Sequence, residues 1–80
     1  MKHAREDYNR IQDPDGKIPE AEPVFLIRGQ DVAGPDAVLH WAKLAESRGA
    51  CVDIVQSARE QALRMRDWQR LNVAKIPDMP

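Results

Sequence analysis

The feature that most constrains this chain is a pair of amphipathic segments joined by a short connection. The first, residues 34–48, begins with Gly34 and Pro35, and Gly49 follows it; proline suits the first turn of a helix and glycine its end. The second, residues 52–72, has apolar residues at the three- and four-residue spacing that places them on one helical side. Because only "RGAC" separates the segments, the sequence predicts an antiparallel two-helix hairpin.

Alanine is frequent on the apolar sides of both predicted helices. Steps of about 100° per residue bring one set of apolar side chains together on each helix. The first set is Ala37, Val38, Trp41, Ala42, Leu44 and Ala45, and the second is Ile54, Val55, Ala58, Ala62 and Met65. Since alanine lets two helices approach closely, we expect a tight contact between them, with Trp41 in the core.

The first part of the chain, residues 1–31, has the composition of turns and extended structure. "DPDG" at 13–16 predicts a turn, because Asp can bond the backbone ahead, Pro fixes φ and Gly tolerates a left-handed conformation. "VFLIR" at 24–28 is short, apolar and bounded by Pro and Gly, which predicts a strand. Its partner would be residues 8–12, in a hairpin around the turn, or the same strand of another subunit. Residues 73–80 are predicted to form an extended tail.

These elements predict one α+β, mostly helical domain over residues 1–80, in which a short N-terminal strand or hairpin precedes the helical hairpin. In a chain of 80 residues, the free energy gained by burying apolar surface only about equals the conformational entropy cost of folding. We therefore expect homo-oligomerisation to complete the fold.

Charge and composition exclude several classes of protein. The formal net charge of −1 lacks the excess of Lys and Arg that sequence-independent binding to duplex DNA requires. A single cysteine, Cys51, excludes an intramolecular disulfide and favours a reducing compartment. The N-terminal "MKHAREDYNR" has no signal-peptide core, and no apolar run is long enough to span a membrane. We expect a soluble, cytoplasmic protein.

Catalytic and metal sites find little support in the sequence. His3 and His40 are isolated, and the pattern has no metal-ligand pair at i, i+4 spacing. Cys51 could pair with His40 as a nucleophile, but we interpret it as a structural residue that extends the apolar side of the second helix. Glycine-rich phosphate loops and hydrolase motifs are absent from the sequence. The sequence therefore predicts a protein that is not an enzyme and has no cofactor and no metal.

Two polar clusters outside the helices suggest a ligand-binding site. They combine a tyrosine that can stack, arginines that can bind phosphate and amides that can bind polar edges, as nucleotide-binding sites do. The candidate ligand-binding residues are Tyr8, Asn9 and Arg10 in the first cluster and Arg28, Gln30 and Asp31 in the second. The alternative is a structural network of hydrogen bonds at turns and strand ends.

The second predicted helix carries further candidates. Arg59, Arg66 and Arg70 fall within about 40° of one another beside its apolar side, and arginine binds phosphate or carboxylate through a planar fork. They would border a ligand or partner, or else form a solvated helix side whose cations suit the C-terminal dipole. Trp68 would close the hairpin, a subunit contact or a ligand site.

Three stretches of the chain carry a resemblance to known sequences. They are "HAREDYNRIQDPDGKIPEAEPVFLIRGQD", "AVLHWAKLAESRGA" and "RMRDWQ". Together they cover nearly the whole chain and resemble a group of short proteins encoded by tailed phages and prophages, with an "EPVFLLRxQD"-like strand and a Trp-containing helical hairpin. The resemblance implies a viral or mobile-element origin and a compact fold, and it supplies no mechanism.

From these features we expect a non-enzymatic, phage-type accessory protein with an anti-defence role. It would bind and sequester a small anionic, nucleotide-like ligand in an oligomer. The alternative is an inhibitor or adaptor that acts on a host protein through the second helix. Both hypotheses place the protein in the host bacterial cytoplasm, with neither duplex DNA nor a membrane as a partner.

Overall fold

A computed structural model gives the structure of the chain and describes residues 2–9 and 13–79. The chain divides into two compact units: Met1–Ile27 with Asp78–Pro80, which we call the N-terminal unit, and Arg28–Pro77, which we call the hairpin unit. The regular elements of the described residues are a short 3-10 helix, η1 (Glu6–Tyr8), and two α-helices, α1 (Gly34–Ser47) and α2 (Val52–Leu71).

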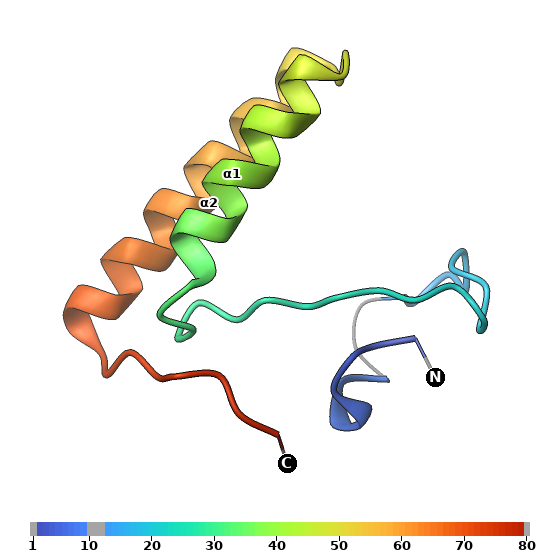
Figure 1. Cartoon of the computed structure of the whole chain (residues 1–80), viewed down its shortest axis with the longest axis horizontal. Coiled ribbons are helices and arrows are strands. Elements are labelled where there is room, and N and C mark those ends of the chain that lie inside the picture. Colours follow the sequence, from blue (N-terminus) through green and yellow to red (C-terminus); the bar gives the residue numbers. More distant parts are fainter. Residues whose placement is uncertain (1, 10–12, 80) are drawn as a thin grey trace. The chain divides into compact units, whose positions relative to one another are not determined.

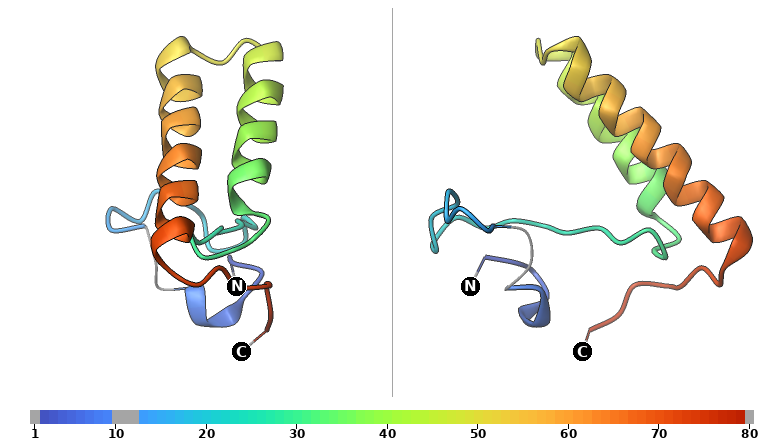
Figure 2. Two further views of the ribbon diagram at one scale, coloured as in Figure 1. Left: turned by 90° about the vertical axis from the view of Figure 1, so that its left-hand side faces the viewer. Right: turned by 180° about the vertical axis from the view of Figure 1, so that it is seen from behind.

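The hairpin unit is built from α1 and α2, which lie side by side and run in opposite directions (Figures 1 and 2). The predicted antiparallel helical hairpin is therefore confirmed, and each helix ends one residue before the end of its predicted range. None of the helices formed by the described residues is long and apolar enough to cross a membrane.

The connection between the helices explains why α1 ends where it does. Gly49 has φ of 88°, a left-handed conformation that glycine adopts without strain, and its N–H donates to the Glu46 carbonyl at 3.1 Å. The N–H of Ala50 donates to the Ala45 carbonyl at 3.0 Å, so the last carbonyls of α1 are satisfied within the turn. Cys51 then starts α2 from an extended conformation and is exposed, so our interpretation of it as part of the apolar side was wrong.

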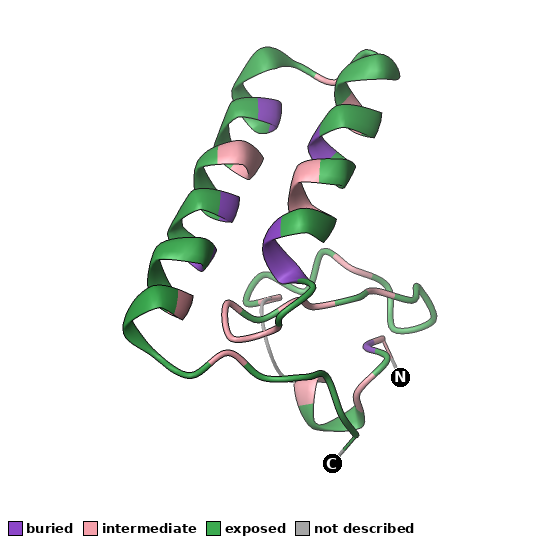
Figure 3. Ribbon diagram, turned by 60° about the vertical axis from the view of Figure 1, so that its left-hand side comes forward, coloured by how far each residue is buried: buried purple, intermediate pink, exposed green. Residues whose placement is uncertain are grey.

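The seam between α1 and α2 contains the core of the hairpin unit, as the inward-facing buried positions in Figure 3 show. Among the described residues, the buried apolar side chains are Ala42, Val55, Ala62 and Met65. Trp41 is 49% exposed, so its predicted place in the core was wrong. Two packed helices bury only the side chains that lie directly between them. Because Trp41 lies about 100° around α1 from the buried Ala42, it falls outside this contact.

The strand predicted for residues 24–28 is not formed. The described part of the chain contains isolated bridges only, and here Val24 forms a single parallel bridge with His3. Tyr8, a predicted partner, lies in η1, and residues 10–12 fall outside the described residues. An apolar run becomes a strand only when a neighbour supplies a ladder of hydrogen bonds. The β part of the predicted α+β fold is thus reduced to irregular extended chain.

Two extended segments of the hairpin unit, one around Asp31 and the other around Lys75, lie side by side and are parallel. The N–H of Val32 donates to the Lys75 carbonyl at 3.0 Å, and the N–H of Lys75 donates to the Gln30 carbonyl at 2.6 Å. The half-buried amide of Gln69 on α2 donates to the carbonyls of Gly29 and Asp31 at 2.9 and 2.7 Å. Gln69 therefore ties the segment that precedes α1 to the side of α2.

Replacing Gln69 by alanine should destabilise the hairpin unit by about 1–3 kcal/mol, because two carbonyls lose a partner in a partly buried place. Urea unfolding followed by far-UV circular dichroism measures the change. Gln56 is an exposed glutamine of the same helix, and Gln56→Ala should change stability by less than about 0.5 kcal/mol. Equal losses in the two variants would contradict the role of Gln69.

Candidate functional site

Tyr8 in the N-terminal unit is held between a cation and a second ring. The guanidinium of Arg5 lies 4.8 Å from the centroid of the Tyr8 ring. The His3 ring meets Tyr8 edge-on, with centroids 6.4 Å apart and an interplanar angle of 87°. Arg5 also pairs with Asp7 at 2.8 Å and Asp78 at 3.4 Å. The arginine that stacks on Tyr8 is thus Arg5, which was not among the predicted ligand-binding residues.

Asn9 acts on the backbone of its own unit. Its Oδ1 accepts the N–H groups of Lys2 and His3, both at 3.1 Å. This arrangement fixes the first described residues against the end of η1 and agrees with the structural alternative for this residue. Arg10, the third predicted residue of the first cluster, lies outside the described residues.

Asp13 organises the predicted turn. Its Oδ1 accepts the N–H of Lys17 at 2.8 Å, and its Oδ2 accepts the ammonium of Lys2 at 2.7 Å. The Ile18 N–H approaches the same carboxylate at 3.3 Å. The Lys2 hydrogen bond, followed by the backbone N–H groups of Lys17 and Ile18, lowers the pKa of Asp13 below its ordinary value of 3.8, and desolvation opposes this only in part. Gly16 supplies φ of 63° to close the turn.

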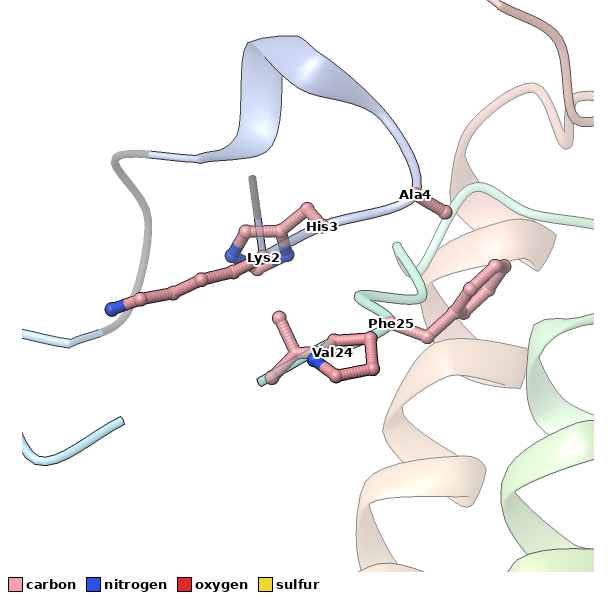
Figure 4. A pocket seen from close by; sticks show the side chains of 6 residues that line it. Lys2, His3, Ala4, Val24 and Phe25 are labelled. Carbon is pink, nitrogen blue, oxygen red and sulfur yellow. The ribbon is translucent and has the colours of Figure 1, made fainter. Parts of the chain in front are cut away.

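A hollow of about 380 Å³ lies in the N-terminal unit, between the segment after Met1 and the segment around Val24 (Figure 4). Its lining residues are Lys2, His3, Ala4, Pro23, Val24 and Phe25. The walls are mainly apolar, and Phe25 is 73% exposed at one side. Lys2 also lines the hollow, and its ammonium is paired with Asp13 at 2.7 Å.

His3 is the notable polar residue of this hollow. Its side chain is buried at 8% exposure, and its Nδ1 has no hydrogen-bond partner among the described residues. This ring nitrogen is covered by the surrounding protein, and a buried polar atom without a partner costs free energy. The sequence identifies His3 only as an isolated histidine, because the bridge between His3 and Val24 cannot be predicted from the sequence pattern.

The second predicted cluster lies in the hairpin unit and is held by backbone bonds. The carbonyl of Arg28 accepts the Asp31 N–H at 3.0 Å, and Asp31 Oδ1 accepts the Ala33 N–H at 2.8 Å. The carbonyl of Gln30 is used by Lys75. Arg28 itself is exposed. The two predicted clusters belong to different units, so a site shared by them stays a prediction.

The sequence carried a signal for the role of Gln69 that was missed. Val55, Ala62 and Gln69 follow one another at intervals of seven, which places all three on the same side of α2. A polar residue on a side that is otherwise buried needs a hydrogen-bond partner. The carbonyls of Gly29 and Asp31 are that partner.

The predicted arginine cluster on α2 is engaged in ion pairs. Arg59 pairs with Glu46 of α1 at 3.2 Å, and Arg66 pairs with Asp36 of α1 at 2.8 Å. Both arginines therefore connect the two helices, a role that was not predicted from the sequence. Exposed pairs of this kind contribute about 0–1 kcal/mol each.

The remaining two candidates of α2 lie at its C-terminal part. Arg70 pairs with Asp67 on the same helix. Trp68 is 44% exposed. Its predicted roles in closing the hairpin, a subunit contact or a ligand site all stay predictions.

Side chains that could bind a metal ion are not gathered in the described residues. No cluster of three or more His, Cys, Asp or Glu side chains is arranged there to hold a metal ion. Cys51 and His40 are both exposed, Cys51 at the start of α2 and His40 within α1.

Comparison with known proteins adds no assignment. The chain matches no family model, and no similar curated protein and no similar solved structure was found. The residues themselves therefore carry the functional argument.

Acid titration should reveal the bond between Lys2 and Asp13. The lowered pKa of Asp13 means that this contact stabilises the N-terminal unit above the ordinary pKa, and the stabilisation is lost as pH falls through the lowered value. We expect the ¹⁵N amide signal of Lys17 to titrate with a midpoint below 3.8.

Two variants complete the titration. Asp13→Asn should remove the transition from the Lys17 amide, whereas Asp15→Asn, which changes a neighbouring exposed carboxylate, should leave it in place. A midpoint at or above 3.8 in the wild-type protein would show that Asp13 does not accept these bonds.

Proposed function

We propose that the protein is a non-enzymatic binding protein that holds a small anionic ligand of the nucleotide class in the hollow of the N-terminal unit. The observation that carries this proposal is the lining of the hollow, in which the apolar Pro23, Val24 and Phe25 are joined by Lys2 and His3.

The walls of the hollow suit a flat ring with an attached anion. Pro23, Val24 and Phe25 offer apolar surface, and the exposed ring of Phe25 is available for stacking on a base. The ammonium of Lys2 has three donors, of which one is bonded to Asp13 at 2.7 Å. We place the anionic group of the ligand near this ammonium as part of the proposal.

The hollow is open to solvent, and its volume is compatible with a small ligand. At about 380 Å³, the hollow lies near the lower end of the range of about 300–1,000 Å³ that small-molecule sites occupy. One base-sized ring with a short anionic group fits this range better than a dinucleotide does.

The residues predicted from sequence act in this proposal mainly as supports. Asn9 holds the backbone of Lys2 and His3, and Tyr8 contacts the edge of the His3 ring. A site needs such rigid support to keep its contacts in place. Contacts of the ligand with Arg10, Arg28, Gln30 and Asp31 remain part of the hypothesis drawn from the sequence.

Binding without chemistry fits a protein that withdraws a ligand from use. An anti-defence role in a phage-infected cell is proposed on the resemblance to phage-encoded proteins alone. Homo-oligomerisation is proposed because a chain of 80 residues has so little apolar surface to bury on its own.

The alternative, an inhibitor or adaptor that binds a host protein through α2, has one observation in its favour. Trp68 is 44% exposed, and exposed aromatic residues are frequent anchors in protein interfaces. In that case Trp68→Ala would abolish the interaction while ligand binding by the N-terminal unit stayed unchanged.

Titration calorimetry with linear and cyclic mononucleotides tests the proposal. Wild type should bind at least one of them, and Phe25→Ala should weaken that binding by about 5- to 150-fold, the range expected for loss of one stacking contact. Since Phe25 is exposed, the variant should keep its fold.

The matched control is Leu71→Ala, which removes another exposed apolar side chain, this time from the hairpin unit, and should bind like wild type. His3→Phe, which fills the same place without a ring nitrogen, should also bind more weakly. The proposal is wrong if no nucleotide of the panel binds wild type, or if Phe25→Ala binds as tightly as Leu71→Ala.

A further inference from the structure

The hairpin unit has two different broad sides. The ion pairs of Arg59 with Glu46 and of Arg66 with Asp36 both cross from α2 to α1 on one side of the seam. Steps of about 100° per residue turn Arg59 and Arg66 to one side of the buried Ala62. We call this the arginine side.

The other side of the seam carries large apolar side chains around Gln61, whose Oε1 accepts a hydrogen bond from Arg64 at 3.1 Å. The same helical steps turn Ile54 and Trp68 of α2, and Trp41 of α1, away from the arginine side. Their exposed fractions are 47%, 44% and 49%. We call this surface the tryptophan face. Large apolar side chains gathered in this way on a small protein mark an interaction surface.

Residues of α2 on the tryptophan face are arranged symmetrically. Ile54, Gln61 and Trp68 follow one another at intervals of seven and form one line along the helix. A two-fold axis through Gln61 that reverses the helix direction exchanges the two ends of this line. It places Ile54 of one copy against Trp68 of the other, twice, and the two Gln61 amides beside each other.

The first helix fits the same axis. The pairs of Arg59 with Glu46 and of Arg66 with Asp36 set the register of α1 against α2, which puts Trp41 within about one helical turn of the level of Gln61. The axis therefore brings the Trp41 rings of two copies close together, where aromatic side chains stabilise a contact.

The tryptophan face extends along much of α2. A helix of 20 residues is about 30 Å long, and Ile54 and Trp68 are separated by about 21 Å along it. The net charge of −1 gives little repulsion between two copies.

A second copy also supplies what the hairpin unit lacks. Two of its buried apolar side chains, Ala42 and Ala62, are alanines, which contribute little to the core. Pairing two hairpins through their tryptophan faces adds Trp41, Ile54 and Trp68 to the buried set. We propose that two copies of this chain associate in this way into an antiparallel four-helix bundle, with α2 packed against α2.

Sedimentation equilibrium of the full chain at several concentrations tests the proposal. Wild type should have twice the chain mass of 9.1 kDa. Ile54→Lys should raise the dissociation constant at least 100-fold, because the symmetry buries the new ammonium twice in an apolar contact. Leu63→Lys is the matched control: Leu63 is exposed on the same helix but lies on the arginine side, so its dimer should persist.

Cross-linking tests the position of the axis without disturbing the fold. In a Cys51→Ser background, Gln61→Cys should form a disulfide-linked dimer under mild oxidation, whereas Gln56→Cys should not. The proposal is overturned if wild type sediments as a 9.1 kDa monomer, if Leu63→Lys dissociates as much as Ile54→Lys, or if Gln56→Cys cross-links as well as Gln61→Cys. Binding of a different protein to the tryptophan face of a monomeric wild type would also overturn it.

Discussion

The close contact of two helices through alanine is the constraint on which the hairpin unit depends. Ala42 and Ala62 are fully buried in the seam, where larger residues would separate the helices. The same smallness means that the seam removes little apolar surface from water. The large apolar side chains, Trp41 and Trp68 among them, are left on the flanks. The use of alanine in the seam therefore explains both the small core and the large apolar side chains that remain exposed on the tryptophan face.

Hydrogen bonds from side chains to the backbone hold the segments that burial does not. Asn9 and Asp13 organise the N-terminal unit, and Gln69 fixes the segment before α1. Each of these side chains satisfies two backbone groups or more. A unit held by such hydrogen bonds can keep an apolar ring exposed. Phe25 is exposed and His3 is buried, and both line the hollow that we propose as the ligand site.

Features with a local cause could be predicted from the sequence, and features that need a distant partner could not. The bounds of α1 follow from Pro35 and Gly49, and the turn follows from Asp13 and Gly16, all within a few residues of the structure they produce. The strand at 24–28 needed a ladder that the described chain does not supply. For the candidate site, Tyr8 was predicted as a ligand-binding residue and stays a prediction, whereas its observed partners His3 and Arg5 could not be predicted because they are set by the way the chain folds back.

The central claim is that the seam between α1 and α2 is too thin to stabilise the hairpin unit without a second copy. The urea midpoint of unfolding, measured by circular dichroism over a 100-fold range of protein concentration, tests this claim directly. If folding and association are coupled, the folded state gains about 2.7 kcal/mol over that range and the midpoint rises. A midpoint that does not change with concentration would contradict the claim, because it would show that the isolated chain is stable by itself.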